Sequence, residues 1–305
     1  MDILFKAIET TDKEIITSFT FSSPFQNCDF SFANICSWSF LYKSEYAVVD
    51  GFLLIRFHVQ DGDGRLVYMC PLGDGDIVRP VNLLEEDSLK HGHPLRLLGI
   101  SPEAKARLEE SFPDGFRYIP ERNYFDYIYL REDLINLSGK KYQPKRNHIN
   151  HFKKLYKYDY KPITPDLVNE CLKLECKWYK ANHTDEDEEK LSYERRSMTF
   201  ALQHASELGL LGGAICVEGQ IVAFSFGAPI NANTFGVHVE KADISYAGAY
   251  NIINNEFVRR IPEEYRFINR EEDLGISGLR QAKLSYQPVI LLEKNTAIKK
   301  LPSGK

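Results

Sequence analysis

Residues Phe267–Tyr286, FINREEDLGISGLRQAKLSY, change character twice within a short distance. An apolar strand end passes directly into a run of charged and polar residues. Gly275 then permits a sharp turn, and Ser277 can cap a helix that continues to the end of the stretch. Burying unpaired charge is costly, so such a run is poor packing material after a buried strand. Where a strand ends and a helix begins in an open α/β sheet, however, these residues are well placed to meet a ligand.

Several side chains in this stretch suit specific ligands. Arg270 suits a phosphate or carboxylate, because its guanidinium donates two parallel hydrogen bonds, and Glu271 suits an ammonium group. Arg280 and Lys283 lie at i and i+3 of the predicted helix, where they could hold a phosphate or form a solvated face. A solvated loop with an ordinary salt bridge is the alternative for the whole run. The predicted substrate-binding residues of the run are Asn269, Arg270 and Asp273.

The composition is that of a soluble globular protein. The chain has 305 residues, of which 43% are apolar and 27% charged, which is enough for two domains. A net charge of −5 argues against general coating of nucleic acid but leaves room for a local basic patch. No run approaches the roughly 18 apolar residues of a membrane span. The start, MDILFKAIETTDKE, contains acids and no apolar signal-peptide segment, so we expect a cytoplasmic protein.

Disulfide and metal chemistry are not indicated. The six cysteines are scattered among apolar neighbours without a CxxC pair, so we predict reduced thiols. His91 and His93 form an HxH pattern, but nothing nearby completes a set of metal ligands. We therefore predict no metal site.

Apolar spacing predicts a similar order of elements in both halves of the chain. The first half reads as a strand, two helices, three hairpin-linked strands, and then helix, strand, helix and strand. The second half reads as a strand, two helices, a hairpin, strand, helix, strand, helix and a last strand at Val289–Glu293. We infer two diverged copies of one unit. The predicted division is a first domain at 1–138, a basic connecting helix at 139–158, and a second domain at 159–305 that carries the main site.

The connecting segment is strongly basic. Residues Lys140–Lys157, KKYQPKRNHINHFKKLYK, contain seven Lys or Arg, two His and no acid. Ile149 and Phe152 belong to an apolar stripe at helical spacing, which suits packing. A solvated linker helix is one interpretation of the segment. The other is a phosphate-binding surface, with Arg146 and Lys153 among its residues, for a tRNA, a nucleotide cofactor or a lipid headgroup.

Three motifs resemble a known family: RNHINHF at Arg146–Phe152, VEKA at Val239–Ala242, and NREEDLGISGLRQAKLSYQP at Asn269–Pro288. They resemble the family once named DUF2156, which corresponds to the C-terminal catalytic domain of phosphatidylglycerol lysyltransferases. The order of elements looks like the GNAT (N-acetyltransferase) fold taken twice, as in the related Fem-type peptidyltransferases, which take an amino acid from aminoacyl-tRNA. The resemblance implies an α+β protein of two tandem GNAT-like domains, each a mixed central sheet flanked by helices. It also implies transfer of an acyl or aminoacyl group to an amine or hydroxyl.

The resemblance points to one strand as the place of the chemistry. Attack on an ester or thioester needs a base to remove a proton and donors to hold the oxyanion. Alternation along Thr234–Lys241 puts His238 and Glu240 on one face, where either could be that base. A satisfied core histidine is the alternative for His238. Tyrosine is the acid for the leaving group in some relatives, so the predicted catalytic residues are His238, Glu240, Glu271 and Tyr286.

The donor is left open between aminoacyl-tRNA, held by the basic surface at 140–157, and acyl-CoA. Acetyl-CoA-using members place Arg/Gln-x-x-Gly-x-Gly/Ala at a helix start, where N–H groups hold the pyrophosphate. Aligned on Gly248, this sequence has Ser245 at the first place and Tyr250 at the last. The predicted cofactor-binding residues are Lys241, Ser245, Tyr246, Ala247, Gly248, Ala249, Arg280 and Lys283.

Two alternatives from other classes remain. A non-catalytic module could bind a nucleotide or phosphorylated metabolite as a sensor. A peripheral membrane partner is the other, although the family's lysyltransferases carry a multi-helix membrane part with no counterpart in this sequence.

Overall fold

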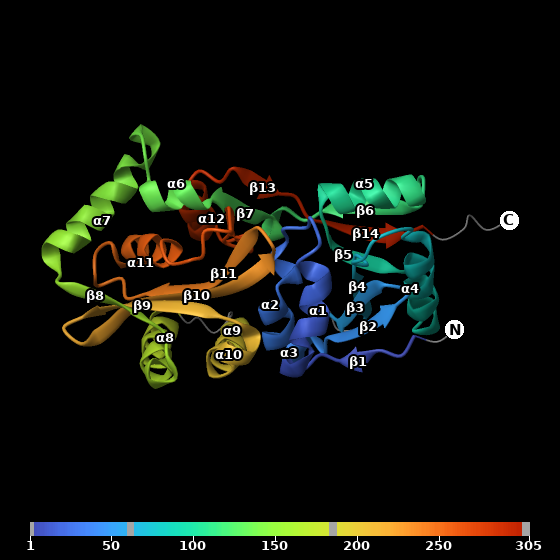
Figure 1. The fold of residues 1–305 in the computed structure, drawn as a ribbon, viewed down its shortest axis with the longest axis horizontal. Coiled ribbons are helices and arrows are strands. Elements are labelled where there is room, and N and C mark those ends of the chain that lie inside the picture. The colour runs from blue at the N-terminus through green and yellow to red at the C-terminus, as the bar shows by residue number, and fades with distance from the viewer. Residues whose placement is uncertain (1–2, 60–63, 183–187, 301–305) are drawn as a thin grey trace.

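The computed structural model describes residues 3–59, 64–182 and 188–300. These residues form two mixed sheets of seven strands each, which lie end to end along the molecule with helices on their faces (Figure 1). The predicted α+β class, with a mixed central sheet in each half, is confirmed. None of the helices within the described ranges is long and apolar enough to cross a membrane.

The first sheet has the strand order β1-β2-β3-β4-β5-β14-β6. Its β4 and β5 run parallel, whereas the neighbouring pairs on either side are antiparallel. The strands of this sheet are β1 (Lys6–Ala7), β2 (Glu45–Val49), β3 (Phe52–His58), β4 (Leu66–Met69), β5 (Arg96–Ile100), β6 (Phe116–Pro120) and β14 (Asn295–Lys299).

The second sheet has the order β13-β7-β12-β11-β10-β9-β8. Its β11 and β12 run parallel and pair from Thr234 and Phe267 to Gly236 and Asn269. Beyond Gly236 and Asn269 strand β11 continues while β12 ends, so the two segments diverge. The strands are β7 (Asp126–Leu130), β8 (Tyr158–Pro162), β9 (Leu211–Val217), β10 (Gln220–Asn231), β11 (Thr234–Ala242), β12 (Phe267–Asn269) and β13 (Ile290–Leu292).

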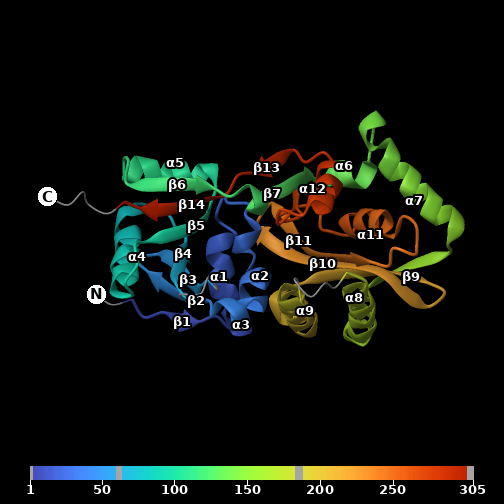
Figure 2. The ribbon, with the colours of Figure 1, turned by 180° about the vertical axis from the view of Figure 1, so that it is seen from behind.

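Helices cover both faces of the second sheet. On one face α8, α9 and α2 pack over β10, and on the other face α11 packs over β9 and β10 (Figures 1 and 2). The helices are α1 (Lys13–Thr20), α2 (Phe32–Ser37), α3 (Ser39–Tyr42), α4 (Val78–Lys90), α5 (Pro102–Ser111), α6 (Arg131–Asn136), α7 (Gln143–Leu155), α8 (Val168–Asn182), α9 (Glu188–Gln203), α10 (Ala205–Leu208), α11 (Ala249–Val258) and α12 (Ser277–Leu284).

The basic connecting segment forms α7, which packs against α11. The short helix α6 lies beside α7 and also contacts α11 (Figure 1). Ile149 and Phe152 are buried, as the predicted apolar stripe requires, and Lys153, Lys154 and Lys157 are exposed. The helix therefore keeps a cationic face toward solvent at one end of the molecule.

The two halves exchange strands. β7 follows the first sheet in sequence but lies in the second sheet, between β13 and β12. β14, which the sequence did not predict, returns to the first sheet between β5 and β6. The division into 1–138, 139–158 and 159–305 stays a prediction about folding units, because the sheets do not follow those boundaries.

A buried lysine joins the segments at this exchange. Lys294, between β13 and β14, is 3% exposed. Its ammonium lies 2.6 Å from Glu272, 2.8 Å from Asp29 and 2.9 Å from Asp126. Burial alone would lower the pKa of Lys294, but the three carboxylates raise it well above its ordinary value. These contacts tie together the residues after β12, the turn before α2, the start of β7 and the link to β14.

We predict that Lys294→Met lowers the free energy of unfolding by about 3–5 kcal/mol, because it leaves buried carboxylates without their cation. Urea denaturation measures the change. Lys300→Met is the control, since Lys300 pairs with the exposed Asp114 and its loss should cost less than about 1 kcal/mol. Equal stabilities of the two variants would contradict the role of Lys294.

Candidate functional site

The polar run after β12 folds into a compact loop held by its own side chains. Asn269 is fully buried and donates to the Gln26 carbonyl and to Asp126, each at 2.8 Å. Its side-chain oxygen accepts the backbone N–H of Glu271 at 2.7 Å. Glu271 adopts a left-handed conformation with φ of 57°, which is unfavourable for a residue other than glycine. The fold thus fixes Glu271 in a strained position, a common feature of functional sites.

Lys283 supports the same loop from α12. Its ammonium donates to the Arg270 carbonyl at 2.5 Å and to the Glu272 carbonyl. Burial lowers the pKa of Lys283, against the effect of neighbouring Glu271. Lys283, which the sequence predicts as a phosphate ligand, therefore donates its hydrogen bonds to the backbone on either side of Glu271.

Arg280 also binds within the loop. Its guanidinium donates two hydrogen bonds of 2.8 Å to the carboxylate of Asp273 and one to Asn123. Asp273 is fully buried and also accepts from Arg122 at 2.9 Å and from the Tyr127 hydroxyl at 2.5 Å. Burial alone would raise the pKa of Asp273, but these donors lower it well below the ordinary aspartate value. Arg280 and Asp273 thus stabilise the loop together.

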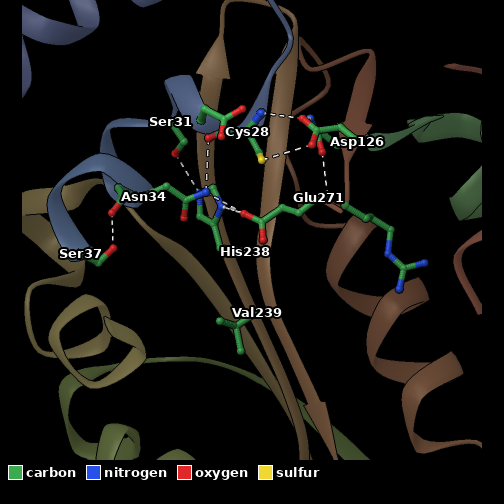
Figure 3. Close-up of polar contacts among 12 residues, drawn as sticks. Cys28, Ser31, Asn34, Ser37, Asp126, His238, Val239 and Glu271 are labelled. Carbon is green, nitrogen blue, oxygen red and sulfur yellow. Dashed lines mark hydrogen bonds and ion pairs between the residues drawn. The ribbon is translucent and has the colours of Figure 1, made fainter. Parts of the chain in front are cut away.

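Glu271 meets a histidine from β11 and two residues from the first half of the chain (Figure 3). Its Oε1 lies 2.8 Å from His238 Nδ1 and accepts the Asn34 amide at 2.7 Å. His238 Nε2 lies 2.9 Å from the Ser31 hydroxyl. A carboxylate only accepts, so Nδ1 carries a proton, and in the neutral ring Nε2 accepts from Ser31. The Ser31, His238 and Glu271 side chains form a continuous hydrogen-bonded chain.

Exposure differs along this chain. Ser31 is fully buried, and the His238 side chain is 5% exposed. The Glu271 side chain is 22% exposed, so it is the member that solvent or a substrate can reach. A proton taken up at Glu271 would arrive beside an imidazole already oriented by Ser31. The carboxylate can therefore act as a base whose orientation is fixed by hydrogen bonds from His238 and Asn34.

The expectation that His238 and Glu240 share one face of β11 is wrong. Phe226 and Gly227 of β10 pair with Val239 and Val237, so His238 is an extra residue in a β-bulge. Val237 belongs to the core under α11, whereas Val239 packs on the opposite core. The bulge breaks the alternation, and Glu240 consequently turns toward α11, away from His238.

A second polar cluster surrounds Glu240 on the α11 side. Glu240 accepts from Arg270 at 3.0 Å and from Asn254 at 3.1 Å. The Tyr286 ring lies 4.9 Å from the Arg270 guanidinium, and its hydroxyl accepts from Asn251 at 2.8 Å. Burial raises the pKa of Tyr286 to about 12, so the phenol keeps its proton at neutral pH. Arg270 and Tyr286, predicted separately as substrate-binding and catalytic residues, thus lie together.

The start of α11 is the predicted place for an acyl-CoA pyrophosphate. Gly248 lies there with φ of 92°, and a Cβ at this position would come within 2.6 Å of the His148 carbonyl of α7. The Ala249 N–H donates to the Tyr246 carbonyl at 3.0 Å. Ala247 is exposed, and the Tyr246 ring packs near Tyr156. α7 therefore covers the glycine from which a pyrophosphate would be held.

The carboxylate of Asp243 in this loop also disfavours binding of a pyrophosphate. The Ser245 N–H and hydroxyl both bind the carboxylate of Asp243, at 3.0 and 2.7 Å. Lys177 pairs with the same carboxylate. Although burial acts in the opposite sense, hydrogen bonds from Lys177 and Ser245 lower the pKa of Asp243, which is therefore ionised at neutral pH. The loop residues do not fit a pyrophosphate.

The remaining predicted ligands have internal partners. Lys241 is buried, with its ammonium 2.8 Å from Glu194 and 3.3 Å from the centre of the Trp178 ring. Arg146 donates to the Leu137 and Gly139 carbonyls, which closes the turn before α7. Lys153 is half exposed, 3.9 Å from Glu256.

One group of potential metal ligands lies together within the described ranges. It consists of Cys28, Asp126 and Glu272. Both carboxylates already bind the ammonium of Lys294, at 2.9 and 2.6 Å. A metal ion would have to displace this buried cation, so the group is better explained as part of the junction.

Several residues of the two clusters were missed in the sequence. Ser31 and Asn34 lie more than two hundred residues from His238 and Glu271, and no local pattern connects them. Asn254 looks like any polar residue of an amphipathic helix. Lys145 lies in the basic run, which was the available signal, but its place above Tyr286 depends on how α7 packs.

Comparisons with known proteins agree with this fold. The family model described as "Phosphatidylglycerol lysyltransferase, C-terminal" matches residues 21–298. A protein of unknown function from Bacteroides thetaiotaomicron is 52% identical, with a TM-score of 0.94, and the match covers 98% of this chain and 100% of that chain. L-PGS from Bacillus licheniformis is 17% identical, with a TM-score of 0.65 over 96% of this chain and 93% of that chain. The predicted tandem GNAT-like fold is confirmed.

A curated relative matches over a shorter length. An uncharacterized protein of Mycoplasmoides gallisepticum is 27% identical over 173 residues, which are 55% of this chain. The match covers 54% of that protein, so the chain spans about half the length of the relative.

We predict that Asp273→Asn lowers stability at pH 7 by about 2 kcal/mol or more, because Arg280 and Arg122 lose an anionic acceptor and one of its two oxygens becomes a donor. The folded-state pKa of Asp273 lies below the unfolded value of about 3.9, so its contribution is present above that pH and disappears as the pH falls below it. The difference in unfolding free energy between wild type and variant should therefore shrink below about pH 4. Exposed Asp159→Asn is the control, with a small change at every pH. A pH-independent difference for Asp273→Asn would contradict the assignment.

Proposed function

The chain belongs to the phosphatidylglycerol lysyltransferase C-terminal family, and we propose that it transfers an aminoacyl group from aminoacyl-tRNA to an amine or hydroxyl acceptor. The observation that carries the proposal is Glu271. It is held in a strained conformation at the point where β11 and β12 separate, with His238 and Ser31 behind it. A packing residue has no need of such support.

Glu271 is the general base in this proposal. It takes a proton from the attacking amine or hydroxyl as the new bond forms to the ester carbonyl carbon. The ester C–O bond then breaks, and the ribose oxygen leaves with a proton. His238 and Ser31 are positioning residues: Ser31 orients the imidazole, the imidazole orients the Glu271 carboxylate, and neither side chain touches the substrate. Tyr286 remains the predicted acid for the leaving group.

Aminoacyl-tRNA is the proposed donor in preference to acyl-CoA. In the loop before Gly248 the Ser245 N–H already donates to the Asp243 carboxylate. That carboxylate is ionised and would repel a pyrophosphate. The exposed end of α7 instead offers Lys153 and Lys154, together with Lys157 just after the helix, to a phosphate backbone. These observations favour an RNA-borne donor.

A group of exposed apolar side chains near the site favours a lipid hydroxyl as the acceptor. Large apolar residues are exposed from the loop after β12 through α12 to β13, a grouping that is typical of a surface that meets another apolar surface. They are Leu274, Ile276, Leu284, Val289 and Leu291. The peripheral membrane contact, which the sequence left as an alternative, is therefore proposed for this side of the molecule.

We predict that Glu271→Gln reduces transfer by roughly 10²-fold or more. Glutamine keeps the hydrogen bonds of Glu271 to His238 and Asn34 but is not a base at neutral pH. The assay follows loss of labelled aminoacyl ester from tRNA, with free amines and phosphatidylglycerol vesicles as acceptors and with acyl-CoA as the competing donor.

Glu263→Gln is the matched control, because Glu263 is exposed and lies away from the site. It should leave the transfer rate unchanged. Full activity of Glu271→Gln, or transfer only from acyl-CoA, would contradict the proposal. Tight ligand binding without turnover on any acceptor would favour the non-catalytic sensor.

A further inference from the structure

The Glu240 cluster contains two buried polar atoms that lack a partner. Among the described residues, Arg270 Nη1 and Asn254 Oδ1 make no hydrogen bond, and Asn254 is 1% exposed. Both side chains bind Glu240 through their other atoms, so the unpaired donor and the unpaired acceptor flank the same carboxylate. Buried polar groups are normally paired with protein or ligand or ordered water. The cluster therefore offers hydrogen bonds to a group that both accepts and donates.

Lys145 of α7 closes this cluster toward solvent. Its ammonium lies 4.0 Å from the centre of the Tyr286 ring, on which the Arg270 guanidinium also packs, at 4.9 Å. Burial and the neighbouring Arg270 lower the pKa of Lys145 to about 8, while Glu240 acts in the opposite sense. Two cations thus share one carboxylate, which leaves the cluster with one excess positive charge. An anion would balance it.

We propose that Arg270 and Lys145 bind a phosphate group of a ribonucleotide, and that Asn254 accepts a hydrogen bond from one of its hydroxyl groups. The proposal rests on the proposed function in taking the RNA donor as the source of that nucleotide. The ring contact leaves the long Lys145 side chain free to move aside, so a phosphate can reach Arg270 Nη1. Lys153 and Lys154 of the same helix and Lys157 just after its end are exposed, which favours RNA over a lipid headgroup.

The test measures binding of AMP to the full chain by calorimetry, with adenosine and glycerol phosphate as comparison ligands. Lys145→Met keeps a flexible apolar side chain over Tyr286 but removes the charge, and we expect AMP affinity to fall about tenfold or more. Lys173→Met, at an exposed lysine of α8 that pairs with Glu170, should change it less than about twofold. Adenosine should bind much more weakly than AMP.

The pH dependence supplies a second readout. Bound phosphate favours the charged form of Lys145, so AMP affinity should fall as the pH rises through about 8 in wild type but not in Lys145→Met. The charged or titratable groups facing Lys145 are Arg270, Glu240 and Tyr286, and the pKa of Tyr286 lies near 12, outside this range. The phosphate of AMP is fully ionised over the same range.

Two results would overturn the inference. Absence of AMP binding at millimolar concentration would mean that ordered water alone satisfies Arg270 and Asn254. Glycerol phosphate binding as tightly as AMP would assign the cluster to a lipid headgroup. The two proposals fail separately, because Glu271→Gln should lower transfer yet keep AMP binding. If the wild-type protein shows Glu271-dependent transfer but does not bind AMP, this inference is rejected and the proposed function stands.

Discussion

The ammonium of Lys294 among three carboxylates, of which that of Asp126 is fully buried, is the contact on which the rest of the structure depends. One of those carboxylates, Asp126, accepts from Asn269, and Asn269 in turn holds the backbone N–H of Glu271. A chain of hydrogen bonds, charge-assisted at Asp126, therefore runs from the junction of the two sheets to the strained residue of the site. Removing a buried cation from such a network leaves unpaired charge, which is far more costly than losing an exposed pair.

This connection explains why the two halves exchange strands. β7 brings Asp126 into the second sheet, and the return of the chain to β14 brings Lys294 between the halves. The same docking places α2 against β10, so that Ser31 and Asn34 reach His238 and Glu271. The site is therefore composite: the second sheet supplies the base and the imidazole, and the first half of the chain orients them. Positioning of this kind is where much of the rate enhancement of group transfer arises.

The sequence predicted what local patterns encode. The order of elements, the helix of the basic segment and the polar loop after β12 all follow from apolar spacing and turn residues. It failed where the outcome depends on a distant partner. The opposite faces of His238 and Glu240 result from a bulge that the register of β10 imposes. Arg280 and Lys283 look like phosphate ligands in sequence, yet Asp273 and the loop carbonyls bind them. A charged run shows which residues can pair, but only the fold shows with whom.

The most direct test of this account is nuclear magnetic resonance of the His238 ring in isotope-labelled protein. We predict the Nδ1–H form of the neutral ring, with that proton protected from exchange by Glu271 and exposed to exchange in Glu271→Ala, which removes the acceptor. We also predict that Ser31→Ala, in the first half of the chain, changes the Nε2 signal. An Nε2–H ring with a freely exchanging proton, insensitive to both substitutions, would contradict a composite site built around Glu271.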